Sequence, residues 1–159
     1  SVESLRMAEV GFYQLRTSLL EHALPKLLQK ALDAGHRVRV VGGSDARMEA
    51  LSTAFWTYDP ETFLAHGLAR DGDAERQPIY LTAESTDSTI NENAADLVVT
   101  IDGVEPVFLE GVVRYLDMFD GKDETALESA RRRWKRRAAE GHTTSYWRQG
   151  EDGGWEKLG

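Results

Sequence analysis

The sequence predicts a three-layer α/β fold, in which a mostly parallel sheet carries helices on both of its faces. Strand and helix patterns alternate along the first half of the chain, which is typical of a parallel sheet with crossover helices. The expected strands are short continuous apolar runs rather than alternations, which indicates that both faces are covered. The 159 residues fit one domain. These observations favour a doubly wound arrangement.

The first predicted unit is a strand over Glu9–Leu15 followed by a helix. Ser18 and Glu21 have the spacing of a capping box, in which each side chain satisfies a free amide of the first turn. Pro25 should kink or restart the helix, and Gly35 is placed to end it. Apolar residues recur at helical spacing in between: Leu20, Leu24, Leu27, Leu28, Ala31 and Leu32.

The second unit begins with a strand over Val38–Val41, and Gly42-Gly43-Ser44 turns into a second helix. That helix should end within residues 56–60, because the residue before a proline avoids helical backbone angles. Residues 61–66 are expected to form one short turn, and the polar residues 67–77 a loop. The apolar residues of the helix are Met48, Leu51, Ala54 and Phe55.

Two further strands are predicted over Pro78–Thr82 and Leu97–Ile101, with a polar loop over residues 83–93 between them. The next segment is ambiguous. Four of its apolar residues have helical spacing, whereas residues 112–115 also fit a strand. The four residues with helical spacing are Phe108, Val112, Leu116 and Phe119.

A final helix is predicted to start near Asp123-Glu124, where acidic residues favour the helix N-terminus, and to run to about Glu140 before Gly141. Beyond it, Tyr146-Trp147 and Trp155 flank a glycine-rich segment, which predicts a terminal hairpin or a loosely held tail. We treat residues 143–159 as a C-terminal extension of a single domain over residues 7–159. Met7 is the expected natural start, and residues 1–6 are expected to be an added segment.

The composition excludes several classes of function. The chain has no cysteine, which excludes disulfides and thiolate metal sites, and its net charge of −8 disfavours a general nucleic-acid binder. No apolar run reaches the length of a membrane span. We therefore expect no membrane association and no direct nucleic-acid binding, and the negative charge favours a protein partner.

No catalytic constellation is evident. The four histidines lack metal-ligand spacing, and His66, close to Asp59 and Glu61, is the best catalytic candidate among them. The Gly42-Gly43 turn follows a strand and opens a helix, so a small nucleotide-binding enzyme is the alternative hypothesis. The turn lacks the lysine of a P-loop and the three-glycine dinucleotide fingerprint. We expect no catalytic residue, no metal and no cofactor.

A basic run stands out against the acidic whole: six of the seven residues in Arg131–Arg137 are cationic, and Trp134 lies inside the run. On a helix, Trp134 falls on the apolar stripe that faces the protein, and Arg131 and Lys135 flank it. Glu128 is placed to pair with one of the arginines. The stripe consists of Ala126, Leu127, Ala130, Trp134 and Ala138. Cations beside an apolar wall indicate a site for an anionic ligand, although a solvated helix end gives the same pattern.

A second cluster is aromatic. Residues 55–66 contain Phe55, Trp56, Tyr58 and Phe63 around Pro60. Core packing at a helix end explains such a cluster. A hydrophobic patch for a protein partner explains it too, because Trp and Tyr are favoured interface anchors.

The ordered motifs of this chain resemble the chi subunit family of bacterial DNA polymerase III. The matching segments are listed in chain order: residues 11–15 (GFYQL), 24–28 (LPKLL), 35–38 (GHRV), 55–67 (FWTYDPETFLAHG), 77–82 (QPIYLT), 93–96 (NAAD) and 130–135 (ARRRWK), with Gly141 six residues later. Each segment alone is weak, whereas their order and spacing together are specific.

The resemblance implies a non-catalytic, cytoplasmic bacterial replication protein with a doubly wound, Rossmann-like fold. Chi subunits bind the acidic C-terminal tail of single-stranded DNA-binding protein, which ends in phenylalanine. They also bind the psi subunit, which links them to the clamp-loader complex. By position, the tail-binding residues are Arg131, Trp134, Lys135 and Arg136, and the psi-facing patch is Trp56, Pro60 and Phe63. The family commonly has tyrosine where this chain has Trp134.

Overall fold

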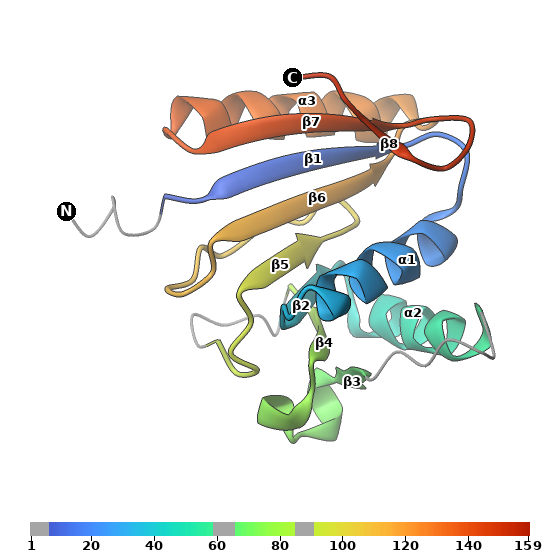
Figure 1. Ribbon diagram of the computed structural model, residues 1–159, viewed down its shortest axis with the longest axis vertical. Helices are drawn as coiled ribbons and strands as arrows, with labels where there is room; N and C mark the ends of the chain where they lie inside the picture. Colours follow the sequence, from blue (N-terminus) through green and yellow to red (C-terminus); the bar gives the residue numbers. More distant parts are fainter. Residues whose placement is uncertain (1–6, 59–65, 85–90) are drawn as a thin grey trace.

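The structure is a computed structural model that describes residues 7–58, 66–84 and 91–159 (Figure 1). These residues form an eight-stranded sheet in the order β3-β4-β2-β5-β6-β1-β7-β8. All neighbouring strands are parallel except the last pair, β7 and β8. The strands are β1 (Glu9–Leu15), β2 (Val38–Gly42), β3 (His66–Leu68), β4 (Ile79–Ala83), β5 (Leu97–Thr100), β6 (Arg114–Asp120), β7 (Thr143–Gln149) and β8 (Trp155–Lys157). The helices are α1 (Leu20–Asp33), α2 (Asp45–Tyr58) and α3 (Glu124–Ala139), with short 3₁₀ turns at Ala69–Asp71 and Ala74–Arg76.

Helices cover the sheet on both faces, which confirms the predicted three-layer, doubly wound fold. Figure 1 shows α1 in front of the sheet and α3 behind β7 and β1. The core is accordingly divided in two. One apolar cluster lies between the sheet and α1 and α2, and the other lies between the sheet and α3. Residues 101–113 pack with α3, through Val104, Leu109 and Val112.

The sequence placed most elements correctly. The strands predicted over residues 9–15, 38–41, 78–82 and 97–101 are all present within one residue of these limits. They are buried along most of their length, as continuous apolar runs require.

Two strands, β6 and β3, differ from the predictions. The helix suggested by Phe108, Val112, Leu116 and Phe119 is wrong, and the alternative prediction of a strand is nearer: β6 begins at Arg114 and pairs with β1 and β5. Leu116 and Phe119 have helical spacing only because β6 is apolar on both faces and therefore has no clear period. The strand β3 lies inside the segment predicted as turn and loop, and it begins at His66.

The capping box predicted at the start of α1 does not form. Leu19 is the N-cap and makes no side-chain cap bond, while Glu21 pairs with Arg47 at 2.8 Å. Gln149 of β7 instead holds the segment that precedes α1, because its Oε1 accepts hydrogen bonds from the amides of residues 16–18 at 3.0–3.1 Å. Its Nε2 donates to the Ser18 hydroxyl at 3.0 Å. The partner of Ser18 is thus distant in sequence, where no local pattern reveals it.

The helix α1 runs without interruption through Pro25 and ends where Gly35 adopts a φ of +87°. The restart predicted at Pro25 is therefore wrong, whereas the predicted terminator is confirmed.

The C-terminal residues form a hairpin that is part of the sheet. Strand β7 pairs in parallel with β1 over six residues, and β8 returns antiparallel to β7. The hairpin prediction is confirmed, and the loosely held tail is wrong. The helix α3 leads into β7 and packs on the face of the sheet formed by β7, β1 and β6.

Candidate functional site

The basic helix α3 begins and ends as its sequence predicts. Asp123 is the N-cap and accepts hydrogen bonds from the amides of Thr125 and Ala126 at 2.9 and 3.2 Å. Gly141 follows the helix with a φ of +94°, a conformation that favours glycine.

The inner face of α3 differs from the predicted apolar stripe. Its buried residues are Ala130, Arg133 and Arg137, while Ala138 is exposed. Arg133 is 3% exposed and makes two charge-assisted hydrogen bonds to Asp117 of β6, at 2.7 and 2.9 Å. A guanidinium is buried only when a carboxylate accepts its donors, and β6 supplies that carboxylate here.

Arg137 has a structural role as well. It forms ion pairs with Glu140, at 2.5 Å, and with Glu105, and its guanidinium lies over the Phe108 ring. Arg133 and Arg137 therefore do not belong to the exposed part of the basic run. Both attach α3 to the protein.

Four cations of the basic run are exposed. Arg136 pairs with Glu105, which leaves Arg131, Arg132 and Lys135. Within the described residues, no carboxylate lies within ion-pair distance of any of these three, and the pairing predicted for Glu128 does not form. In a chain of net charge −8, their charge remains available to an anionic ligand.

Trp134 supplies the apolar part of this surface. Its half-buried ring packs against the core cluster on this face of the sheet, as do Leu127 and Tyr146. Its Nε1 is buried without a hydrogen-bond partner among the described residues. Burial raises the pKa of the Tyr146 hydroxyl, although the positive charges of Arg131 and Arg148 oppose that shift. Arg131 therefore lies on the flank of α3 that faces β7.

The helical phase separates the four predicted tail-binding residues. At about 100° per residue, Arg131 and Lys135 lie within about 100° of Trp134 on one flank, whereas Arg136 is about 160° away. Arg136 pairs instead with Glu105 at 2.7 Å. Three of the four residues thus share one surface, which we call the α3 surface: Arg131, Trp134 and Lys135.

The predicted psi-facing patch is described only at Trp56. The ring of Trp56 lies 4.5 Å from that of His66, and the residue is 51% exposed. Pro60 and Phe63 lie outside the described residues. His66, the best catalytic candidate of the sequence, is buried and its Nε2 lies 2.8 Å from the Ser52 hydroxyl. Its predicted neighbours Asp59 and Glu61 are outside the described residues too.

A cleft of about 520 Å³ lies at the carboxyl ends of β1 and β6, and its lining includes Arg47 and Asp102, which adjoin the Gly42-Gly43 turn. Ligands of doubly wound folds bind at such a position. Here the amide of Gly43 already donates to Asp102 at 3.0 Å, and Arg47 pairs with both Asp102 and Glu21. Partial burial raises the pKa of Glu21, but the hydrogen bond from Arg47, a backbone hydrogen bond and the positive charges nearby together outweigh it and hold that pKa below its ordinary value. The Asp102 carboxylate already occupies the Gly43 amide and would repel a phosphate, so phosphate binding at this turn is disfavoured.

The described part of the chain holds neither a metal-ion cluster nor a membrane-spanning helix. Its histidines, aspartates and glutamates form no group of three suited to hold a metal ion. Its helices include none with the length and apolar character needed to cross a membrane.

The doubly wound fold and the α3 surface define a small α/β protein that offers exposed cations beside an aromatic ring. A family model described as DNA polymerase III chi subunit, HolC, matches residues 7–145. The chain belongs to this family, which is one of polymerase accessory subunits.

A curated relative is the "Probable DNA polymerase III subunit chi" of Rickettsia prowazekii (strain Madrid E). It is 26% identical to this chain over 113 residues, which cover 71% of this chain and 66% of the relative. The match thus spans slightly less than two thirds of the relative's length.

Proposed function

We propose that this chain is a non-catalytic accessory subunit in DNA replication, and that its α3 surface binds the acidic C-terminal tail of single-stranded DNA-binding protein. One observation carries the proposal: exposed cations lie beside the half-buried Trp134 on α3. These cations have no acidic partner among the described residues. Family membership supports it.

The chemistry of the surface suits such a tail. Arg131 offers a planar fork that holds a carboxylate through two parallel hydrogen bonds, and Lys135 adds a mobile point charge. Trp134 provides an apolar wall for the terminal phenylalanine ring. Since both cations are exposed, their attraction is screened by salt over roughly 8 Å at physiological ionic strength.

The proposal predicts that Lys135→Glu weakens binding of a labelled acidic peptide that ends in phenylalanine by about tenfold, because the change replaces an attraction by a repulsion. Fluorescence anisotropy at low and high salt measures the affinity. The matched control is Arg132→Glu, which makes the same kind of charge change about 160° away from Trp134 on the same helix. Absence of wild-type binding, or equal losses in both variants, would contradict the α3 surface as the tail site.

The same proposal extends to a psi subunit and, through it, to the clamp loader. We propose that Trp56, together with Pro60 and Phe63, contacts psi. The support is the exposed indole of Trp56, since exposed tryptophans are frequent interface anchors.

The tagged chain is expected to retain psi from a lysate of its own organism, and Trp56→Ala is expected to release it. Leu19→Ala serves as the control, because Leu19 is an apolar residue of similar exposure elsewhere on the surface, 59% against 51%. If the Trp56→Ala variant still retained psi, the proposal that Trp56 contacts psi would be contradicted.

A further inference from the structure

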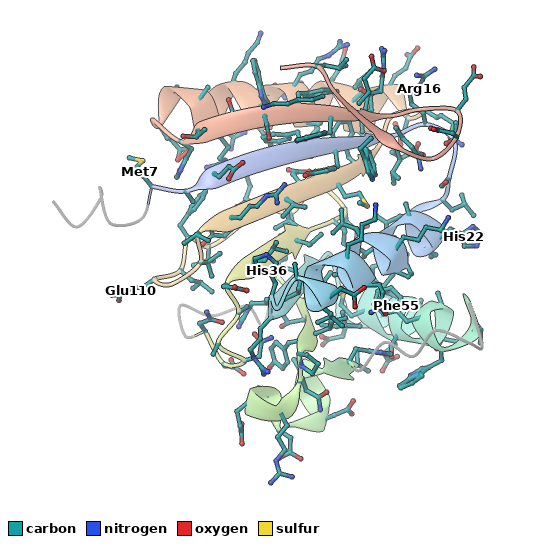
Figure 2. All side chains as sticks on the ribbon, viewed as in Figure 1. Met7, Arg16, His22, His36, Phe55 and Glu110 are labelled. Atoms are coloured by element: carbon teal, nitrogen blue, oxygen red, sulfur yellow. The ribbon has the colours of Figure 1, made fainter. Side chains whose placement is uncertain are left out.

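A long groove lies on the face of the sheet opposite to α3. It runs between α1 and the β7–β8 hairpin, and its volume is about 780 Å³. In Figure 1, α1 leaves β6 and β1 uncovered on the viewer's side of the sheet. The groove follows α1 from Ala23 to Ala34, a length of about 16 Å at 1.5 Å per residue. His36, labelled in Figure 2, lines the groove beyond the C-terminal end of α1.

The lining of this groove is cationic, although the whole chain is acidic. Lys26, Lys30 and Arg114 line it, and no aspartate or glutamate is among the described residues that line it. Among the described residues, none of these three cations has a carboxylate within ion-pair distance. The acid nearest to Arg114 in the sheet register is Glu9, directly across on β1, and it makes no ion pair with Arg114. The charge of the groove is therefore complementary to an anionic occupant.

Arg114 is positioned for such an occupant. Its Nη2 donates to the Tyr13 hydroxyl at 2.8 Å, which holds the guanidinium in the groove. Its Nε is buried without a hydrogen-bond partner in the described part of the chain. The guanidinium is thus partly desolvated and is not neutralised by a carboxylate, so an anion placed beside it lowers the electrostatic free energy.

The aromatic residues of the groove favour a peptide over a nucleic acid. Trp147 stacks on Tyr13 with ring centroids 5.8 Å apart, and Lys157 lies over the same indole at 5.9 Å. Trp155 sets its ring edge-on against Tyr13 at 5.1 Å. Because the rings pack on each other and on a lysine, less ring face is open to stack on bases. They still form an apolar wall for aliphatic side chains.

We propose that this groove binds an extended acidic segment of a partner protein, in which acidic and apolar residues alternate. A length of about 16 Å accommodates about five extended residues at roughly 3.3 Å each. Successive side chains of an extended segment point in opposite directions, so apolar residues face Trp155 and the sheet while acidic residues face Lys26 and Lys30. The proposal concerns a second surface and does not depend on tail binding at α3.

The test uses a six-residue peptide of alternating aspartate and leucine, labelled with fluorescein at its N-terminus and amidated at its C-terminus. Amidation removes the terminal carboxylate. The double variant Lys26→Glu/Lys30→Glu is expected to weaken binding of this probe at least tenfold, measured by anisotropy at low salt. Both lysines are exposed on α1, so the fold is expected to persist and is checked by circular dichroism.

The matched control is Arg76→Glu/Arg132→Glu, which makes two charge reversals at exposed residues outside both the groove and the α3 surface and is expected to leave probe affinity within about twofold. Equal loss in both double variants would overturn the proposal, since the probe would then sense only net charge. Unchanged binding in Lys26→Glu/Lys30→Glu would overturn it too. A thymidine octanucleotide that binds more tightly than the peptide, and competes with it, would assign the groove to nucleic acid instead.

Discussion

Replacing Arg133 by alanine is expected to lower the free energy of unfolding by about 3–5 kcal/mol, because it leaves the Asp117 carboxylate buried without its partner. Both side chains are almost completely buried, 3% and 5% exposed, and they share two hydrogen bonds. Arg133 also donates to the Ser129 hydroxyl at 2.7 Å. Since the total stability of a domain is about 5–15 kcal/mol, one substitution removes a large part of it.

Urea denaturation followed by circular dichroism measures this loss. Arg132→Ala, an exposed neighbour in the same basic run, is expected to change the free energy of unfolding by less than about 0.5 kcal/mol. The double variant Arg133→Met/Asp117→Leu is expected to recover most of the stability, because replacing both members of a buried pair by apolar residues removes the desolvation penalty. A cost below about 1 kcal/mol for Arg133→Ala would show that the pair does not hold α3 on the sheet.

This ion pair also explains why sequence reasoning located α3 but misjudged its inner face. The start at Asp123 and the stop at Gly141 depend on local backbone chemistry, which a sequence displays. The inward direction of Arg133 depends on Asp117, which lies 16 residues earlier on β6. The segment that forms β6 also has apolar residues at helical spacing, so the sequence pattern does not indicate that Asp117 lies on a strand facing α3. Arginine is usually exposed to solvent, but it can be buried where a neighbouring strand supplies a carboxylate partner.

The same distinction holds elsewhere in the fold. Strands β1, β2, β4 and β5 were predictable because burial on both faces leaves continuous apolar runs between polar loops. The hydrogen bonding of the segment before α1 was not predictable, since Gln149 reaches the amides of residues 16–18 from the far end of the chain. The acid-free groove beside α1 was missed for the same reason. Its lysines and Arg114 come from separate elements, and only the fold brings them together.

For the candidate site, the sequence identified which helix carries the free charge and which aromatic lies beside it. The sequence did not indicate that Arg136 lies on a different side of α3 from the other three predicted tail-binding residues. Arg136 has the same chemistry as Arg131 in the sequence, but Glu105, which precedes Arg136 by 31 residues, pairs with Arg136 and not with Arg131. Whether each of these two arginines has an acidic partner therefore depends on the position of residues 101–113 and not on the sequence of the basic run.

The second large effect is expected at Trp134, where stability and binding respond differently to two substitutions. Trp134→Ala is expected to cost about 2–3 kcal/mol of unfolding free energy, less than the roughly 3–5 kcal/mol for a fully buried ring, because Trp134 is half-buried. Trp134→Phe keeps an aromatic ring and removes the buried Nε1 that has no partner among the described residues. Removing an unpaired donor offsets the lost ring area, so its cost is expected to stay below about 1 kcal/mol.

Binding of the phenylalanine-ended acidic peptide separates the apolar role of Trp134 from the role of the neighbouring charges. Trp134→Phe is expected to bind within about threefold of the wild type, because an aromatic wall remains. Trp134→Ala is expected to lose tenfold or more, by isothermal titration at a temperature where circular dichroism shows it folded. The salt dependence of the affinity is expected to be equal in both variants, since Arg131 and Lys135 are unchanged. A Trp134→Ala variant that binds like the wild type would mean that the tail is held by charge alone, and a changed salt dependence would mean that the indole positions the cations rather than the terminal ring.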